Sequence, residues 1–251
     1  MQLEYTVPHE SPRDAPNKPI SKRRPLDELL RPQLPQPPAP GAPMTLGLEL
    51  RQLECVRGRR SLFKGLNLNV LPGHLLRLQG ANGAGKTSLL RMICGLLAPA
   101  HGEVLWRGQR LTALREEFGK QLVYLGHAAA LKDDLSVLEN LVAASVLGGR
   151  SVSAPQATAA LAAAGLRGRE HAPARVLSQG QRKRVALARL VLSSESPLWV
   201  LDEPFNALDT AATAWLLGLI TEQVGRGGIV VLTSHQSVGL SDALPQLALS
   251  L

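Results

Sequence analysis

The segment Gly80-Ala-Asn-Gly-Ala-Gly-Lys-Thr87 carries the strongest chemical pattern in the sequence. It fits the spacing G-x-x-x-x-G-K-[ST] between a predicted strand and a predicted helix. The glycines let backbone N–H groups converge on a phosphate, and the following helix adds the positive end of its dipole. Lys86 supplies a charge for phosphate oxygens and Thr87 a hydroxyl for Mg²⁺. A glycine-rich turn with an incidental lysine is the alternative, and it leaves the strand–loop–helix context unexplained. The predicted phosphate site comprises Gly80, Ala81, Asn82, Gly83, Ala84, Gly85, Lys86, Thr87 and Ser88.

Two acidic residues follow a second apolar segment. Residues 197–201 read Pro-Leu-Trp-Val-Leu and are followed by Asp202-Glu203. Because ligands of open α/β sheets bind at the carboxyl ends of the strands, both carboxylates are expected beside the phosphate. We expect Asp202 to hold Mg²⁺ through water and Glu203 to polarise the water that attacks the terminal phosphate. Without the glycine-rich loop, the favoured interpretation would be that these residues only cap the next turn.

The elements that must position these residues alternate along the chain. Several predicted strands are apolar on both faces, which indicates a parallel sheet covered by helices on both sides. The predicted strands are Leu46–Leu53, Leu66–Leu71, Leu75–Gln79, Glu103–Trp106, Gln121–Leu125, Pro197–Leu201, Gly228–Thr233 and Leu244–Leu249. Helices are predicted at Ser88–Leu97, Val137–Leu147, Pro155–Ala164 and Gly180–Leu192, with one more between residues 201 and 228.

Composition narrows the classes of protein. The 251 residues include 28 Lys and Arg against 20 Asp and Glu, and 45% are hydrophobic, so the chain can bury a core. No apolar run of about 18 residues predicts a membrane span. Aromatic residues make up only 3%, which argues against proteins that stack nucleic-acid bases on exposed rings. A net positive charge can attract nucleic acid, but Lys and Arg are scattered along the chain, so we attribute the charge to a face that lies beside anionic lipid. Cys55 and Cys94 are expected to be buried thiols of a reducing compartment.

The first 45 residues differ from the rest, since they hold 11 of the 18 prolines. Proline fixes φ and removes a backbone donor, so this stretch can build neither helix nor sheet. It has no apolar h-region and is not a signal peptide. We predict that residues 1–45 are a disordered extension and that residues 46–251 are one folded domain. Met44 is a candidate alternative start of the chain.

Five motifs in one order and spacing identify the sequence as a member of the ABC-transporter ATPases. Besides the phosphate loop and the acidic pair, Leu177-Ser178-Gln179-Gly180-Gln181 resembles the L-S-G-G-Q signature. The segment Ala207-Leu-Asp209 resembles the D-loop, and Ser234-His235 resembles the switch histidine. The resemblance runs from about residue 46 to 236. It implies a P-loop NTPase fold with a RecA-like parallel core, an antiparallel β edge and a helical signature subdomain at about 127–180.

The resemblance also implies how such a domain works. ATP and Mg²⁺ would lie between two copies of the chain, arranged head to tail. Ser178 and Gly180 of one copy would contact the terminal phosphate held by the other. His235 would join Lys86 and Glu203 in catalysis. Taken alone, the basic run at residues 182–184 is a solvated helix start, an interpretation left open for part of it.

Three departures from the general family pattern point to a narrower group. The position of the Q-loop glutamine, twelve residues before Glu139, holds His127. Arg57 stands where an aromatic ring usually stacks on adenine, and its planar guanidinium can stack in the same way. The alternative is a solvated arginine of a loop. Gln179 replaces the first glycine of the signature. His127 would sense the γ-phosphate or Mg²⁺, or join the domain to a membrane subunit.

The Gly126-His127 segment and its surroundings resemble the ATP-binding subunits of haem exporters in cytochrome c maturation. That resemblance implies membrane permease partners and a peripheral place on the cytoplasmic face of the bacterial inner membrane. No haem ligand is expected in this chain, which has no C-x-x-C-H, and no nucleic-acid partner is expected. The alternatives are an exporter of another substrate, such as a lipid or small molecule, and a soluble ABC ATPase. Soluble types carry two fused domains or a long coiled coil, and neither is visible here.

Overall fold

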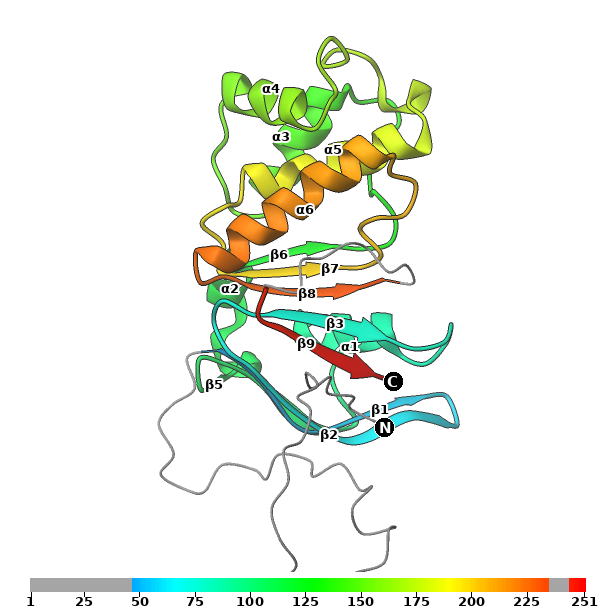
Figure 1. Cartoon of the computed structure of the whole chain (residues 1–251), viewed down its shortest axis with the longest axis vertical. Helices are drawn as coiled ribbons and strands as arrows, with labels where there is room; N and C mark the ends of the chain where they lie inside the picture. Colours follow the sequence, from blue (N-terminus) through cyan, green and yellow to red (C-terminus); the bar gives the residue numbers. More distant parts are fainter. Residues whose placement is uncertain (1–46, 235–243) are drawn as a thin grey trace, which may run out of the picture.

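The computed structural model describes residues 47–234 and 244–251, which form two β-sheets and six α-helices (Figure 1). The larger sheet is parallel and has the strand order β6-β7-β8-β3-β9. Neighbours that are distant in sequence require crossover connections, as the alternation of strands and helices predicts. Its strands are β3 (Leu75–Gln79), β6 (Leu122–Leu125), β7 (Leu198–Leu201), β8 (Ile229–Thr233) and β9 (Gln246–Ser250).

The parallel sheet is buried on both faces, and β7 shows why. Its four residues are all apolar and fully buried. Because side chains alternate along a strand, Leu198 and Val200 pack into one hydrophobic cluster while Trp199 and Leu201 pack into another on the opposite face. The prediction that such apolar strands are covered on both sides is therefore confirmed.

A second, antiparallel sheet forms the other layer, with the order β2-β1-β4-β5. Helix α1 (Lys86–Ile93) lies between the two sheets, and its Leu89 and Leu90 share one core with both of them (Figure 1). The antiparallel edge predicted from the family resemblance is thereby confirmed. The strands are β1 (Leu48–Arg57), β2 (Arg60–Val70), β4 (His101–Trp106) and β5 (Gln109–Arg110).

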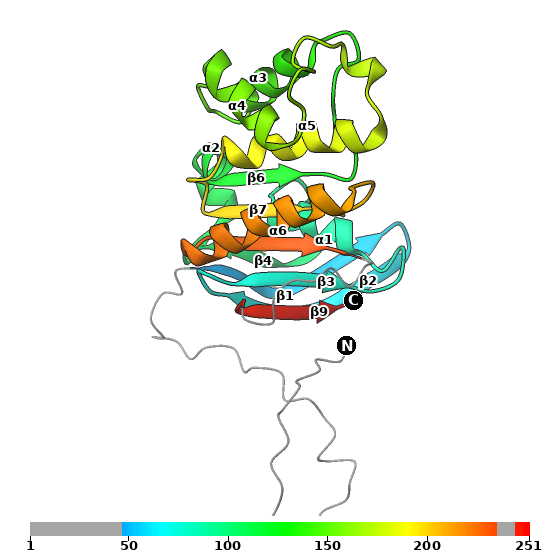
Figure 2. The same cartoon turned by 45° about the horizontal axis from the view of Figure 1, so that its top comes forward.

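Helices α3 to α6 lie on the opposite side of the parallel sheet, where they cover its other face and build a small subdomain (Figure 2). Helix α6 (Thr210–Gly225) packs on the parallel sheet together with α5 (Gln179–Val191). Helices α3 (Val137–Leu147) and α4 (Ala154–Ala163) form a separate apolar cluster with α5. Ser136 and Ser153 start α3 and α4 with capping boxes, which satisfy the first backbone N–H groups. No helix in the two described stretches is long and apolar enough to cross a bilayer.

Several predicted and observed elements differ, and the largest differences concern α1, α2, β2 and β5. Helix α2 (Leu111–Gln121) and the short β5 were not predicted. Strand β2 starts six residues before the predicted Leu66, at Arg60. Helix α1 ends at Ile93 rather than Leu97, because Gly95 has φ 71° and leaves the helical conformation. The predicted extension, residues 1–45, lies outside the described residues.

Candidate functional site

The glycine-rich loop joins β3 to α1 and curls around its own lysine. Lys86, only 7% exposed, donates from Nζ to the carbonyl oxygens of Gly80 at 2.7 Å and Ala81 at 3.0 Å. Gly85 has φ 108° and directly precedes the helix, a conformation that favours glycine. At Gly80, with φ 136°, an added Cβ would lie 2.5 Å from the Leu251 carbonyl oxygen. The loop therefore needs glycine at both of these positions.

Oxygen atoms from three elements meet at the carboxyl edge of the parallel sheet. Thr87 Oγ1, in the first turn of α1, donates to Asp202 Oδ2 at 3.0 Å. Asp202 follows β7 and is 3% exposed. Thr233, the last residue of β8, donates to Asp202 Oδ1 at 2.8 Å. These hydroxyl and carboxylate oxygens are the ligands that Mg²⁺ prefers, so Thr87 and Asp202 fit the predicted metal position.

Glu203 lies next to this cluster and faces the same cavity. Its backbone has φ 48°, in the left-handed region that non-glycine residues rarely adopt, and its N–H donates to Thr233 Oγ1 at 2.8 Å. The Glu203 side chain accepts a short hydrogen bond from Asn206 Nδ2, and His127 Nδ1 lies 3.3 Å from the same Oε2 atom. The carboxylate is therefore held from two sides.

A cavity of about 310 Å³ brings the predicted residues together. Lys86, Thr87 and Glu203 line it, and Arg57, which lies at the end of β1, lines it as well. The cavity offers a cation, a hydroxyl, backbone of the glycine loop and a carboxylate. This set suits a phosphate ester and a water that attacks it.

Three residues near the site were not predicted. Thr233 bridges Asp202 and Glu203, and Asn206 contacts the Glu203 carboxylate. Lys183 Nζ lies 3.5 Å from the Asp202 carbonyl oxygen, and burial lowers the pKa of this lysine. The middle of the basic run is therefore buried rather than solvated. Thr233 is a polar residue at the end of an apolar strand, and this pattern could have identified it in the sequence as a residue of the site.

The signature residues form the start of α5 and lie outside the cavity lining. Ser178 is exposed and caps the helix, since Gln181 N donates to its Oγ at 3.2 Å and its own N–H donates to Gln181 Oε1 at 3.0 Å. An added Cβ at Gly180 would lie 2.6 Å from the Ala207 carbonyl oxygen. The signature is therefore packed against the D-loop of the same chain.

Asp209 starts α6 and also contacts α5. It accepts from Ala212 N at 2.9 Å and makes a short ion pair with Arg184. The backbone hydrogen bond, helped by Arg184, lowers the pKa of the Asp209 carboxyl. His235, the predicted switch histidine, lies outside the described residues.

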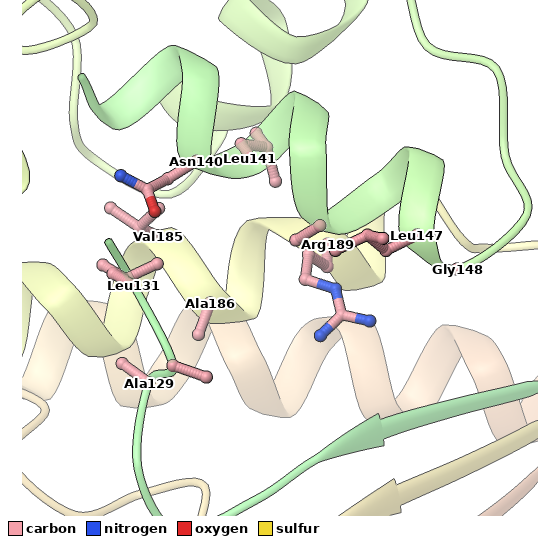
Figure 3. A pocket seen from close by; sticks show the side chains of 11 residues that line it. Ala129, Leu131, Asn140, Leu141, Leu147, Gly148, Val185, Ala186 and Arg189 are labelled. Atoms are coloured by element: carbon pink, nitrogen blue, oxygen red, sulfur yellow. The ribbon is translucent and has the colours of Figure 1, made fainter. Parts of the chain in front are cut away.

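A second hollow of about 270 Å³ lies between α3, α5 and the segment that follows His127 (Figure 3). Its lining is mainly apolar and includes Ala129, Leu131 and the highly exposed Leu147. Arg189 contributes the positive charge, and burial together with the Arg150 guanidinium lowers the pKa of Arg189. The hollow therefore combines apolar surface with a cation.

Sequence comparison places these features in a known context. The sequence profile described as "ABC transporter" matches residues 63–206. The cytochrome c biogenesis ATP-binding export protein CcmA of Dechloromonas aromatica is 52% identical over 193 residues, covering 77% of this chain and 94% of that protein. The CcmA protein of Pseudomonas aeruginosa is 47% identical, covering 77% of this chain and 95% of that protein.

Solved structures share the fold. The ATP-binding subunit of an ABC transporter superposes with a TM-score of 0.66 at 27% identity, covering 75% of this chain and 79% of the other. A dimeric ATP-binding cassette in a post-hydrolysis state, bound to ADP and Pi, has a TM-score of 0.66 at 24% identity and covers 75% and 88%. The second likeness concerns the fold alone.

Proposed function

The chain belongs to the ABC transporter family and, within it, to the CcmA group of cytochrome c biogenesis ATP-binding export proteins, so we propose that it energises a haem exporter serving c-type cytochrome assembly. It is a nucleotide-binding domain of the ABC ATPase type. The observation that carries the proposal is the convergence of Lys86, Thr87 and Glu203 at one cavity, with the buried Asp202 hydrogen-bonded to Thr87. Together with 47–52% identity to these relatives, that convergence favours an active ATPase.

The residues divide the work on ATP between binding and chemistry. The glycine loop and Lys86 hold the phosphates, and Arg57 stacks on the adenine. Thr87, and Asp202 through water, would hold Mg²⁺, which would supply positive charge to neutralise the phosphates. Glu203 acts as general base on the attacking water, with His235 completing the site. The buried contact between Asp202 and Thr87 supports the metal position, and the Glu203 side chain at the cavity supports its role.

Each complete site takes its remaining donors from a second copy of the chain. Ser178 and Gly180 stand at the exposed N-terminus of α5, where a helix favours an anion. They do not line the cavity of their own chain, which supports a head-to-tail pair with ATP between the copies. Asp209 ties α6 to α5 through Arg184, and the D-loop packs against Gly180, which supports a position for the D-loop beside the signature at that interface.

The hollow beside α3 and α5 is the place for a segment of the membrane permease. Its apolar lining and the exposed Leu147 suit a short amphipathic segment, and Arg189 suits an acidic residue on it. Docking there would hold the chain at the cytoplasmic face of the inner membrane as a peripheral subunit. The scarcity of aromatic residues supports a protein that does not bind nucleic acid.

A bacterial strain that carries Lys86→Ala in this chain tests the proposal. Loss of the phosphate clamp should abolish holo-cytochrome c while b-type cytochromes stay normal, because only the covalent haem pathway needs the exporter. Haem staining of membrane proteins and difference spectra measure both. His101 is an exposed strand residue that does not line the cavity, so His101→Gln is the control. It should leave both c-type and b-type cytochromes unchanged. Normal c-type cytochromes in the Lys86→Ala strain would indicate an exporter of another substrate.

A further inference from the structure

His127 and Glu203 are brought together by the register of two neighbouring strands. Strands β6 and β7 run parallel, and their register pairs Leu122 with Leu198 through to Leu125 with Leu201. The ladder continues beyond the strands, since Asp202 N donates to the Leu125 carbonyl oxygen at 2.8 Å. Extending the register by two residues places His127 opposite Glu203. The strand register therefore brings the two residues close together, each two positions beyond the end of its strand.

The side chains of His127 and Glu203 contact each other. His127 Nδ1 lies 3.3 Å from Glu203 Oε2, and Asn206 Nδ2 donates to the same oxygen. The His127 side chain is 70% exposed, whereas that of Glu203 is 18% exposed. Burial therefore does not fix the imidazole, and its described polar contact is the one with the Glu203 carboxylate.

We propose that His127 is a positioning residue for the general base, acting through a hydrogen bond from Nδ1–H to Glu203 Oε2. With Asn206 on the same atom, this donor fixes the orientation of the carboxylate toward the phosphate cavity. The proton must be on Nδ1, because a lone pair there would repel the carboxylate oxygen. The inference rests on the proposed role of Glu203, and it replaces the expectation that His127 contacts the γ-phosphate or Mg²⁺ itself.

The two roles differ in the ring nitrogen that they use. The amide nitrogen of asparagine occupies the place of Nδ1, close to the backbone, whereas that of glutamine reaches the place of Nε2. A positioning residue that works through Nδ1 is therefore replaced by asparagine. A sensor that reaches outward, as the Q-loop glutamine of other ABC ATPases does, is replaced by glutamine.

Steady-state ATP hydrolysis by the full chain tests the inference. His127→Ala should lower kcat about tenfold or more, the loss expected for a hydrogen bond to a charged group. The KM for ATP should change less than about twofold, because the interaction acts on the base and not on substrate binding. His127→Asn should recover most of kcat, whereas His127→Gln should stay near the alanine variant. His101→Gln, the matched histidine control, should behave as the unmodified chain does.

Two results would overturn the inference. Recovery by His127→Gln but not by His127→Asn would assign the residue to the phosphate or metal. A rise in KM for ATP with an unchanged kcat would place it in substrate binding.

The Glu203→Gln background separates this inference from the proposed function. If His127 acts only through the base, His127→Ala should add no further loss to Glu203→Gln. An additional loss in the double variant would overturn the inference while leaving the general base in place. Near-normal turnover of Glu203→Gln alone would instead remove the general-base assignment, and the His127 inference with it.

Discussion

Thr233 holds both acidic residues of the site through one hydroxyl group. Its Oγ1 donates to Asp202 Oδ1 and accepts from Glu203 N, and the residue is fully buried. Thr233→Val keeps the shape but leaves a buried carboxylate oxygen and an N–H without this partner. Leaving such groups unsatisfied costs about 1–3 kcal/mol of unfolding free energy. We expect that loss in urea denaturation, with a lower kcat for ATP.

Thr221→Val is the matched control for this prediction. Thr221 Oγ1 donates to the Leu217 carbonyl oxygen within α6, on the exposed face. Thr221→Val should change the free energy of unfolding by no more than about 0.5 kcal/mol, as is usual for surface substitutions. Equal losses in the two valine variants would mean that the Thr233 hydroxyl has no special role in the site.

Arg57 can be tested as the residue that stacks on adenine. It is exposed and lines the cavity, so Arg57→Ala should weaken ATP and GTP alike, by about tenfold at most. Arg57→Tyr should restore affinity, because a ring stacks on a purine, whereas Arg57→Lys should not. Nucleotide titrations of the three variants measure this. Unchanged affinity in Arg57→Ala would mean that Arg57 is a solvated surface residue that does not contact the nucleotide.

The sequence predicted the residues of the cavity whose roles depend on local pattern. Lys86 and Thr87 follow from loop and helix chemistry, and Asp202 and Glu203 follow from the strand that precedes them. The contacts of Thr233 and Lys183 with Asp202, and that of His127 with Glu203, depend on which strands become neighbours. Strand order is set by tertiary packing. No local spacing contains the register of β6 against β7, so the His127–Glu203 contact could not be predicted.

Among the elements, those whose apolar residues follow one clear helical or strand spacing were predicted best. Helix α3 was predicted with the bounds that it has, and it starts at a capping box. Strands β1 and β2 were placed less well, because Gln52 and Gly65 adopt positive φ and shift the register within the hairpin. Helix α2 carries Leu111, Leu114 and Phe118 at helical spacing. This apolar stripe is narrow and lies among charged residues, so the helical pattern was not recognised in the sequence.

The contact between the start of α5 and the D-loop can be tested at the scale of elements. Gly180→Ala adds a Cβ 2.6 Å from the Ala207 carbonyl oxygen, so one of the two segments must shift. Gly218→Ala is the matched control, because Gly218 lies within α6 with no atom near its added Cβ. Thermal unfolding should show a lower midpoint for Gly180→Ala. It should show an unchanged or higher midpoint for Gly218→Ala, since alanine favours a helix by about 1 kcal/mol over glycine. Similar midpoints for both variants would mean that the loop absorbs the methyl group freely.

At the scale of the whole molecule, the two proposed halves of the site are the phosphate cavity and the signature residues, and the signature residues do not line that cavity in the described chain. The phosphate cavity is formed by the loop before α1, the first turn of α1, Arg57 and Leu62 of the antiparallel sheet, and Glu203 after β7, whereas Ser178 caps α5 outside that cavity. The segment from His127 to Leu131 connects the carboxylate of Glu203 to the hollow beside α3. A partner in that hollow therefore contacts the same loop that holds the proposed base.

Mixed dimers test whether these halves combine between copies. Lys86→Ala removes the phosphate clamp, and Ser178→Arg blocks the signature with a bulky charge, so each variant alone should lose nearly all ATPase activity. In a head-to-tail dimer with one variant in each copy, one site carries both changes and the other carries neither. Mixing the two inactive variants should therefore restore activity, up to the level of one site per dimer. A site completed within a single chain would instead leave every mixture inactive, and ATPase assays across mixing ratios distinguish the two arrangements.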